Sequence, residues 1–248
     1  MTNRLVAAVT GASSGIGSEI ATRLAADGYD LALCARREQR LQDLASKLSQ
    51  EYETEVLTQT VDLRDEGQIL DWFSAIAARF NRLDVLINNA GLGYREPLTQ
   101  GTTEKWRETL DINVIALCIC TREAIKLMRE FGEDNGHVVH IGSMSGHRVP
   151  SSGMYSASKF AVRALTEGLR QELRADKSAI RISSVSPGFV ETEFAEKYSG
   201  STEQAKQIYG QFQVLQPKDI ANAVGYVLGQ PDYVQVHDIL LRPTQQGS

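Results

Sequence analysis

Short, almost wholly apolar runs alternate with longer amphipathic stretches along the entire chain, and this alternation restricts the fold more than any other feature. Runs such as YDLALCA and LDVLINN are apolar over consecutive residues rather than at every second one. Strands of this kind are typical of a parallel sheet that is buried on both faces by helices. The sequence therefore predicts an α/β fold with a doubly wound parallel sheet.

The expected elements follow one another without an interdomain linker, so residues 1–248 are interpreted as a single domain. We expect about seven strands, at residues 4–10, 29–35, 54–61, 83–89, 136–142, 179–187 and 234–241. We expect helices at residues 14–27, 38–50, 65–80, 103–131, 152–175 and 217–228. The pattern weakens in the polar segment 193–213, which is interpreted as a lid over a substrate site.

A glycine-rich loop follows the first expected strand directly. Gly11, Gly15 and Gly17 are spaced G-x-x-x-G-x-G and open the first expected helix. Glycines allow a tight turn there, and the free amides of the helix N-terminus stabilise a pyrophosphate. The spacing differs from the more common G-x-G-x-x-G, but the position after the first strand predicts dinucleotide binding in a Rossmann-type fold.

The end of the second expected strand distinguishes the two nicotinamide dinucleotides. An NAD site has a carboxylate there for the ribose 2′-hydroxyl, whereas an NADP site has an arginine for the 2′-phosphate. The segment LALCARR has Arg36 and Arg37 and no acid. A guanidinium matches phosphate geometry, although the pair also fits a solvated start of the next helix. The sequence favours NADP(H).

A tyrosine and a lysine lie one helical turn apart in YSASK. Tyr155 and Lys159 are expected to project from the same helix face. A phenol with a pKa near ~10 carries protons at neutral pH only if a nearby positive charge favours the phenolate, and Lys159 is placed to supply that charge. Ser143, twelve residues before the tyrosine, is expected to hold a substrate oxygen, with Ser145 as a competing candidate. We interpret this group as a proton-transfer site.

Asn113 lies inside the otherwise apolar part of the long helix expected at 103–131. A buried side-chain amide is costly there unless it finds partners, because it competes with helical hydrogen bonds. A local kink would explain this residue, and a solvent-facing asparagine is the alternative. His140, within VVHIG, is interpreted as a core histidine without a catalytic role.

Six motifs, in this order, resemble those of the short-chain dehydrogenase/reductase family. They are TGASSGIG, NNAG, Asn113 in DINV, Ser143 in IGSMSG, YSASK and PGFVET, and the resemblance covers essentially the whole chain. It implies that Tyr155 is the general acid/base, that Lys159 lowers its pKa and binds the nicotinamide ribose, and that Ser143 fixes the substrate carbonyl. For Asn113 it implies a backbone that holds a water in a proton relay through Lys159.

The resemblance also implies which residues contact the cofactor. Asp62 and Leu63 would lie beside the adenine, and Asn89, Ala90 and Gly91 would line the adenosine ribose side. Val190 and Thr192 would contact the nicotinamide carboxamide and the pyrophosphate. The full expected set is Gly11, Ser13, Ser14, Gly15, Ile16, Gly17, Arg36, Arg37, Asp62, Leu63, Asn89, Ala90, Gly91, Tyr155, Lys159, Pro187, Gly188, Val190 and Thr192. The spacing of twelve residues between Ser143 and Tyr155 is one fewer than usual in the family, so the substrate entrance is expected to differ.

Within the family, SMSGHRV, ALTEGLRQELR and the closing RPT resemble a carbonyl-reductase subgroup. This subgroup includes the vertebrate dehydrogenase/reductase member-eleven type and insect NADP-dependent farnesol dehydrogenases. The similarity implies a small to medium, moderately hydrophobic alcohol or ketone as substrate. Family members commonly form dimers or tetramers through long helices, so a homodimer or homotetramer is expected.

Composition argues against several other classes of protein. With 31 acidic and 26 basic residues the net charge is −5, whereas nucleic-acid binding needs a basic face. No apolar run approaches the length that spans a membrane, and no signal peptide is evident. Three cysteines in apolar segments, Cys34, Cys118 and Cys120, indicate reduced core thiols in a cytoplasmic protein. The four scattered histidines do not suggest a metal site.

The sequence thus predicts an NADP(H)-dependent oxidoreductase that interconverts an alcohol and a ketone or aldehyde. A non-catalytic NADP-binding redox sensor is the alternative, although a sensor has little need for the complete set of Ser143, Tyr155, Lys159 and Asn113. A serine hydrolase is disfavoured because Met144 stands where the nucleophile of a G-x-S-x-G elbow belongs.

Overall fold

The strands of the protein form one seven-stranded parallel sheet, as the sequence predicts. The structure is a computed structural model that describes residues 4–150 and 153–247. The strand order is β3-β2-β1-β4-β5-β6-β7. The strands are β1 (Val6–Thr10), β2 (Asp30–Ala35), β3 (Val56–Thr60), β4 (Val85–Asn88), β5 (His137–Ile141), β6 (Arg181–Pro187) and β7 (Asp238–Leu241).

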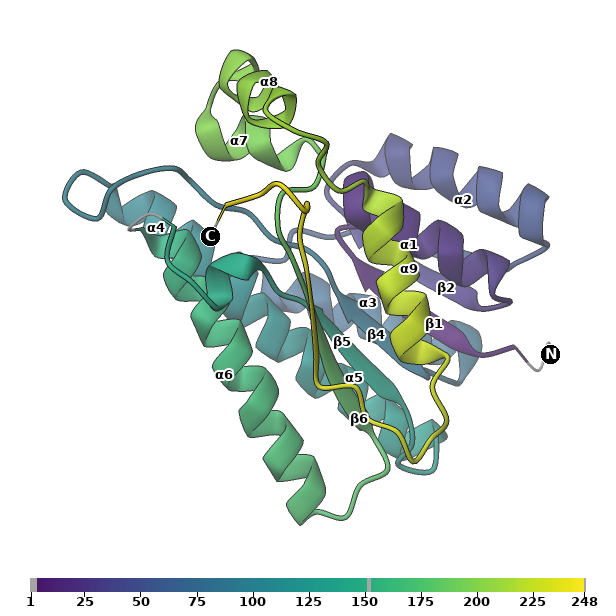
Figure 1. Ribbon diagram of the computed structural model, residues 1–248. Helices are drawn as coiled ribbons and strands as arrows, with labels where there is room; N and C mark the ends of the chain where they lie inside the picture. The colour runs from purple at the N-terminus through teal and green to yellow at the C-terminus, as the bar shows by residue number, and fades with distance from the viewer. Residues whose placement is uncertain (1–3, 151–152, 248) are drawn as a thin grey trace.

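Helices cover both faces of the sheet, which makes the fold doubly wound (Figure 1). On one face lie α1, α2 and α9, and on the other α3, α5 and α6. The helical segments are α1 (Gly15–Ala26), α2 (Glu38–Tyr52), α3 (Glu66–Phe80), α4 (Thr103–Leu110), the π-helix η1 (Asp111–Ile115), α5 (Ala116–Phe131), the 3₁₀-helix η2 (Met144–Gly146), α6 (Met154–Ala175), α7 (Phe194–Ser199), α8 (Thr202–Gly210) and α9 (Pro217–Leu228).

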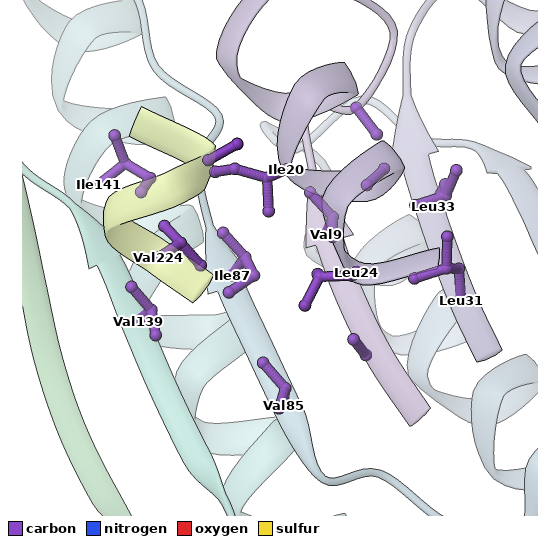
Figure 2. Close-up of a cluster of buried hydrophobic side chains, with 14 of the residues drawn as sticks. Val9, Ile20, Leu24, Leu31, Leu33, Val85, Ile87, Val139, Ile141 and Val224 are labelled. Carbon is purple, nitrogen blue, oxygen red and sulfur yellow. The ribbon is translucent and has the colours of Figure 1, made fainter. Parts of the chain in front are cut away.

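Neighbouring strand residues contribute to separate cores on the two sides of the sheet, since successive side chains point to opposite faces. Val9 of β1 packs with Ile20 of α1 and Val224 of α9, as Figure 2 shows. Ala8, the residue before Val9, belongs to the opposite core, which contains Trp72 of α3. Burial on both faces explains why the strand sequences are apolar throughout rather than alternating.

The order of the strands locates the place where a ligand can bind. The chain runs from β1 outward through β2 and β3, then returns to the other side of β1 to form β4. The loops that leave β1 and β4 therefore diverge, and in open parallel sheets ligands bind at such a switch point, beyond the carboxyl ends of the strands. Helices α7 and α8 lie together beyond the same end of the sheet (Figure 1).

Four expectations differ from the structure in detail. The segment 193–213, for which the sequence predicts no helix or strand, contains two short helices, α7 and α8. The helix expected at 103–131 is interrupted by the π-helix η1, and β7 begins at Asp238 rather than at residue 234. The helix expected from residue 152 begins at Met154, and residue 152 itself lies outside the described residues.

Two further expectations concern the state of the cysteines and the presence of membrane-spanning helices. Cys34 and Cys120 are buried and Cys118 is partly buried, and all three are free thiols. Burial raises the pKa of the Cys120 thiol to about 12. Among residues 4–150 and 153–247, no helix combines the length and the apolar character needed to cross a membrane.

Candidate active site

The glycine loop connects β1 to α1 at the switch point of the sheet. Gly11 and Gly15 have φ values of 67° and 57°, a region that favours glycine. A Cβ on Gly17 would lie 2.4 Å from the carbonyl oxygen of Gly11 and 2.5 Å from Nδ2 of Asn89, so the helix approaches the loop too closely for a side chain. Ile16, which lies between Gly15 and Gly17, packs against the core.

The amino end of α1 fits a pyrophosphate. Its N-cap residue, Ser14, makes no side-chain hydrogen bond to the first-turn amides. Those amides have no partner within the helix, and together with the helix dipole they favour a bound anion. The loop therefore fits the dinucleotide that the sequence predicts.

The loop is joined to the carboxyl end of β4 by hydrogen bonds. Asn89 Nδ2 donates to the carbonyl of Thr10 at 2.9 Å, and the amides of Asn89 and Ala90 donate to the Thr10 hydroxyl at 3.0 Å each. A Cβ built on Gly91 would lie 3.7 Å from Lys159 Nζ and 3.4 Å from Asn113 Oδ1. The NNAG segment thus runs from the glycine loop to the proton-transfer group.

The two arginines at the end of β2 differ in their surroundings. Arg37 lies against the glycine loop, where Nε donates to the hydroxyl of Ser13 at 3.1 Å and Nη2 donates to the hydroxyl of Ser14. Nη1 of Arg37 lies 2.7 Å from the carboxylate of Glu193. Arg36 is exposed. Of the two arginines, Arg37 is therefore the one that contacts the glycine loop.

Asp62 and Leu63 follow β3, the strand next to β2. The backbone amide of Asp62 donates to Oε1 of Gln68 at 2.8 Å. A hydrogen bond from Arg64 holds the pKa of the Asp62 carboxyl below its usual value. Leu63 packs against the core on the α3 side. Because β3 pairs in parallel with β2, both residues lie at the same end of the sheet as Arg36 and Arg37, which follow β2.

Tyr155, Lys159 and Ser143 come together at the carboxyl end of β5. Tyr155 and Lys159 lie in the first turns of α6, and Ser143 lies between β5 and η2. Lys159 Nζ lies 5.9 Å from the centroid of the Tyr155 ring and donates to the carbonyl of Ile141 at 2.9 Å. Tyr155 is hydrogen-bonded to Ser143, whose Oγ also accepts from the amide of Ser145 at 3.1 Å. Of the two serines considered, Ser143 is the one that contacts the tyrosine.

The phenol is not made acidic in this conformation, contrary to the expectation from the sequence. Burial raises the pKa of Tyr155 to about 12, while its hydrogen bond with Ser143 lowers it and nearby Tyr198 raises it. Burial also lowers the pKa of Lys159 to about 8. Desolvation is the largest cause of both shifts, because burial disfavours the charged form of each group. Tyr155 is therefore a neutral phenol here, the form that donates a proton.

Aromatic side chains of α7 cover the tyrosine. The ring of Phe194 lies 5.2 Å from that of Tyr155 and the ring of Tyr198 lies 5.6 Å from it, centroid to centroid. Phe194 and Tyr198 stack on each other at 5.6 Å. On another side, a Cβ on Gly93 would lie 2.5 Å from Cδ2 of Tyr155. These contacts explain the burial that raises the pKa of the phenol.

Asn113 lies in the π-helix η1 and is 1% exposed, so the solvent-facing alternative is wrong. Its Nδ2 donates to the carbonyl of Leu92 at 2.7 Å and to the hydroxyl of Ser158 at 2.9 Å. Ser158 in turn donates to the carbonyl of Tyr155 at 2.7 Å. Asn113 thereby connects the NNAG segment to the first turn of α6, and the π-helix is the local irregularity that the sequence indicates.

The PGFVET segment passes beside the glycine loop. Pro187 ends β6, and the amide of Gly188 donates to the carbonyl of Leu241 at 2.8 Å. Val190 forms an isolated parallel bridge with Leu215. Thr192 approaches the loop so closely that a Cβ on Gly15 would lie 3.1 Å from its Cγ2. The hydroxyl of Tyr209 on α8 donates to the carbonyls of Val190 and Thr192.

Three side chains at the site were not anticipated from the sequence. Glu193 contacts Arg37, and Phe194 and Tyr198 cover Tyr155. The only available signal was the acidic and aromatic content of the segment that follows PGFVET, and no periodic pattern indicated which side chains turn inward.

Two histidines, His140 and His147, have polar partners. His140 is 1% exposed, with Nδ1 lying 2.9 Å from Oγ1 of Thr166 and Nε2 lying 3.3 Å from Oγ1 of Thr121. This confirms its interpretation as a core histidine. His147 Nε2 lies 3.1 Å from Oδ2 of Asp238 and 3.3 Å from Oγ of Ser186.

Known proteins are similar to this chain over nearly its whole length. The family model described as short chain dehydrogenase matches residues 5–203. Dehydrogenase/reductase SDR family member 11 of Gallus gallus is 48% identical over 246 residues, which cover 97% of this chain and 96% of that protein. The farnesol dehydrogenase of Aedes aegypti is 40% identical over 243 residues, covering 96% of this chain and 95% of the other.

A solved structure shares the fold over nearly the whole length. It is the alcohol dehydrogenase of the archaeon Thermococcus sibiricus, complexed with 5-hydroxy-NADP. The TM-score is 0.86 at 31% sequence identity, and the match covers 99% of both chains.

Proposed function

Because the chain belongs to the short-chain dehydrogenase family, we propose that it is an NADP(H)-dependent oxidoreductase that interconverts an alcohol with a ketone or aldehyde. The observation that carries the proposal is that Tyr155, Lys159 and Ser143 meet at the same end of the sheet as the glycine loop. A dinucleotide held by that loop would extend along the NNAG segment toward Lys159.

NADP(H) is the cofactor, and it supplies or accepts a hydride when bound. The archaeal alcohol dehydrogenase with the same fold was crystallised with 5-hydroxy-NADP. In this chain the amino end of α1 would hold the pyrophosphate, and Arg37 with Ser13 and Ser14 would hold the 2′-phosphate, since a guanidinium and hydroxyls are suitable donors for it. Lys159 would hold the nicotinamide ribose, and Asn89, Ala90 and Gly91 would line the adenosine ribose side.

The side chains of the chain itself provide the proton transfer. In reduction, the hydroxyls of Ser143 and Tyr155 donate hydrogen bonds to the substrate carbonyl oxygen. The neutral phenol of Tyr155 then gives its proton to that oxygen as negative charge develops on it. The ammonium of Lys159 stabilises the resulting phenolate and assists its reprotonation. Oxidation uses the same groups in the reverse order and begins from the phenolate.

The substrate is a small to medium, moderately hydrophobic alcohol or ketone. The Aedes relative is a farnesol dehydrogenase, and the side chains that cover Tyr155 here are aromatic. A stacked pair of Phe189 and Phe212, with centroids 6.4 Å apart, adds apolar surface in the adjoining segment. Such a lining favours apolar carbon skeletons over charged metabolites.

A substrate panel tests the function. Purified protein is mixed with NADPH or NADP⁺ and with ketones, aldehydes, alcohols and steroids, and the nicotinamide absorbance is followed. Consumption of NADPH or formation of NADPH with members of the panel supports the proposal. Tight binding of NADPH without turnover of any compound would favour the redox sensor instead.

The chain is proposed to act as a homodimer or homotetramer. Large apolar side chains are exposed on η1 and α6, namely Ile115 at 51%, Phe160 at 38% and Leu165 at 37%. Exposed apolar residues of this size on long helices are suited to packing between subunits. Size-exclusion chromatography with light scattering would measure the assembly. A cytoplasmic location stays a prediction from the sequence.

A further inference from the structure

The carboxylate of Glu193 contacts Arg37 and Ser14, two of the residues that are proposed to bind the 2′-phosphate of the cofactor. Its Oε2 accepts from Nη1 of Arg37 at 2.7 Å and from the hydroxyl of Ser14 at 3.3 Å. Its Oε1 accepts from Nη1 of Arg40, on α2, at 2.7 Å. Carboxylate and phosphate are the two anions that a guanidinium fork binds best. The donors around Glu193 are thus those of a phosphate site.

All three guanidinium nitrogens of Arg37 already donate hydrogen bonds in this arrangement. Nε donates to Ser13, Nη2 donates to Ser14, and Nη1 donates to Glu193. A phosphate that enters beside the carboxylate would also meet a like charge, because Arg40 and Arg37 hold the pKa of Glu193 at about 2 and keep it ionised at neutral pH. The two anions therefore compete rather than bind together.

The ion pair can be exchanged from solvent. The side chain of Arg37 is 34% exposed, that of Glu193 40% and that of Arg40 50%. Ion pairs with this exposure are weak, since water competes with both partners. An incoming dianionic phosphate with several acceptor oxygens can replace a single carboxylate there.

The same segment reaches the proton-transfer group through its next residue. Phe194, which follows Glu193, packs against Tyr155 with its ring tilted by 47°, and Tyr198 of the same helix contacts Tyr155 as well. The carbonyl of Tyr198 also accepts from the amide of Arg95 at 2.8 Å. Helix α7 is thus fixed at its start by the phosphate-binding arginines and along its length by the tyrosine that it covers.

We propose that Glu193 is an internal counter-anion of Arg37 and Arg40, which the 2′-phosphate of the cofactor displaces, and that this displacement releases α7 from Tyr155. The inference rests on the proposed NADP(H) function and deepens it. NAD(H), which lacks the 2′-phosphate, leaves Glu193 in place, and α7 then still covers Tyr155. Only NADP(H) uncovers the tyrosine, and this difference adds to the preference for NADP(H) over NAD(H). Glu193 is in this sense a residue that determines cofactor specificity without being catalytic.

Binding of adenosine fragments tests the competition without turnover. Calorimetry is carried out with adenosine 2′,5′-bisphosphate and with 5′-AMP on the wild type, on Glu193→Gln and on the control Glu191→Gln. Glu191 is a suitable control because its carboxylate accepts from Gln216 and contacts neither arginine. We expect Glu193→Gln to tighten the bisphosphate roughly 3- to 10-fold and to leave 5′-AMP unchanged. Glu191→Gln should leave both affinities unchanged.

Hydrogen exchange tests the release of α7. Saturating bisphosphate should speed amide exchange in residues 194–199 of the wild type, whereas saturating 5′-AMP should not. Glu193→Gln should show the faster exchange before any ligand is added. Unchanged exchange in residues 194–199 on addition of the bisphosphate would overturn the release step.

The failure of this inference can be distinguished from the failure of the proposed function. If Glu193→Gln binds the bisphosphate equally or more weakly while the wild type still prefers it to 5′-AMP, the counter-anion role is wrong and the NADP(H) function stands. If neither the wild type nor Glu193→Gln prefers the bisphosphate to 5′-AMP, the arginines do not bind a 2′-phosphate. The counter-anion role and the NADP(H) function then both fail. If only Glu193→Gln prefers the bisphosphate to 5′-AMP, Glu193 competes strongly with the 2′-phosphate in the wild type, which supports the counter-anion role.

Discussion

Asn113 and Leu92 exchange two hydrogen bonds, as two paired strand residues would. Nδ2 of Asn113 donates to the carbonyl of Leu92 at 2.7 Å, and the amide of Leu92 donates to Oδ1 of Asn113 at 2.9 Å. A side chain thereby satisfies both backbone groups of a residue in a loop that has no sheet partner there. The π-helix turns this side chain toward the loop that follows NNAG.

Removing the Asn113 side chain should therefore destabilise the protein. Asn113→Ala leaves the amide and carbonyl of Leu92 without their partners, and we expect a loss of about 2–4 kcal/mol in the free energy of unfolding. Urea denaturation followed by circular dichroism measures this loss. Ser158→Ala removes only one of the contacts and should cost less. Equal stability of Asn113→Ala and the wild type would show that these hydrogen bonds contribute nothing.

Tyr155→Phe should abolish most of the turnover and leave NADPH binding within about twofold of the wild type. The substitution removes only the hydroxyl that donates the proton, and general acid/base groups contribute about 10²- to 10⁴-fold to rates. Steady-state kinetics with an active ketone and fluorescence titration with NADPH measure the two effects. Retention of most of the turnover would exclude the tyrosine as the acid.

Lys159→Met should change how stability depends on pH. Burial lowers the pKa of Lys159 to about 8 in the folded protein, whereas an unfolded lysine titrates near ~10.4. Between these values the unfolded state binds more protons, so the stability of the wild type should rise with pH from about 8 to about 10.5, by roughly 2–3 kcal/mol from this residue.

Denaturation of both proteins across that pH range tests the expectation. The methionine variant keeps an unbranched side chain one atom shorter than lysine but lacks the titrating group, so its stability should rise less steeply. Parallel curves for the two proteins would mean that the ammonium is not desolvated as the structure indicates. The variant should also lose turnover, because the charge that stabilises the phenolate is gone.

Arg37 should matter more than Arg36 for the choice of cofactor. Arg37 donates to Ser13 and Ser14 beside the glycine loop, whereas Arg36 is exposed. We expect Arg37→Ala to lower the ratio of kcat/KM for NADPH over NADH about 10- to 100-fold, the range for a lost charged hydrogen bond. Arg36→Ala is the matched control with a smaller effect. A larger effect at Arg36 would reverse the assignment.

The buried histidines should make the protein sensitive to acid. Burial lowers the pKa of His137 and of His140 to about 3 each, below the unfolded value near ~6.5. The unfolded state then binds more protons at pH below 6.5, and each histidine should remove about 1.4 kcal/mol of stability per pH unit as the pH falls. His140→Asn should show a shallower decline than the wild type between pH 6.5 and 4. An unchanged slope would indicate that His140 is protonated in the folded state.

The arrangement of the strands and most of the site could be inferred from residue patterns. Strands buried on both faces must be apolar on every residue, and helices that cover them must be amphipathic, so periodicity alone identified them. The helix 217–228 was predicted at its observed bounds because a proline begins it. Tyr155 and Lys159 share a helix face by covalent geometry, which requires no tertiary information.

The segment 193–213 shows where such inference stops. Helices α7 and α8 are too short to form alone in water and depend on contacts made after folding. Tyr209 on α8 donates to the carbonyl of Val190, and nothing in the local sequence encodes that contact. The weak pattern between 193 and 213 therefore predicted neither helix.

The sequence by itself determined the sheet, the glycine loop and the spacing of the tyrosine, lysine and serine, because these features depend on local geometry and on solvent exclusion. Only the tertiary structure decided that Arg37 rather than Arg36 contacts the glycine loop. It also decided that Glu193, 156 residues further along the chain, pairs with Arg37, and that aromatic rings cover Tyr155. The physical reason is that charge pairing and desolvation depend on distances between segments remote in the chain. Those distances also set the phenol's pKa, which burial raises to about 12 despite the lysine one turn away.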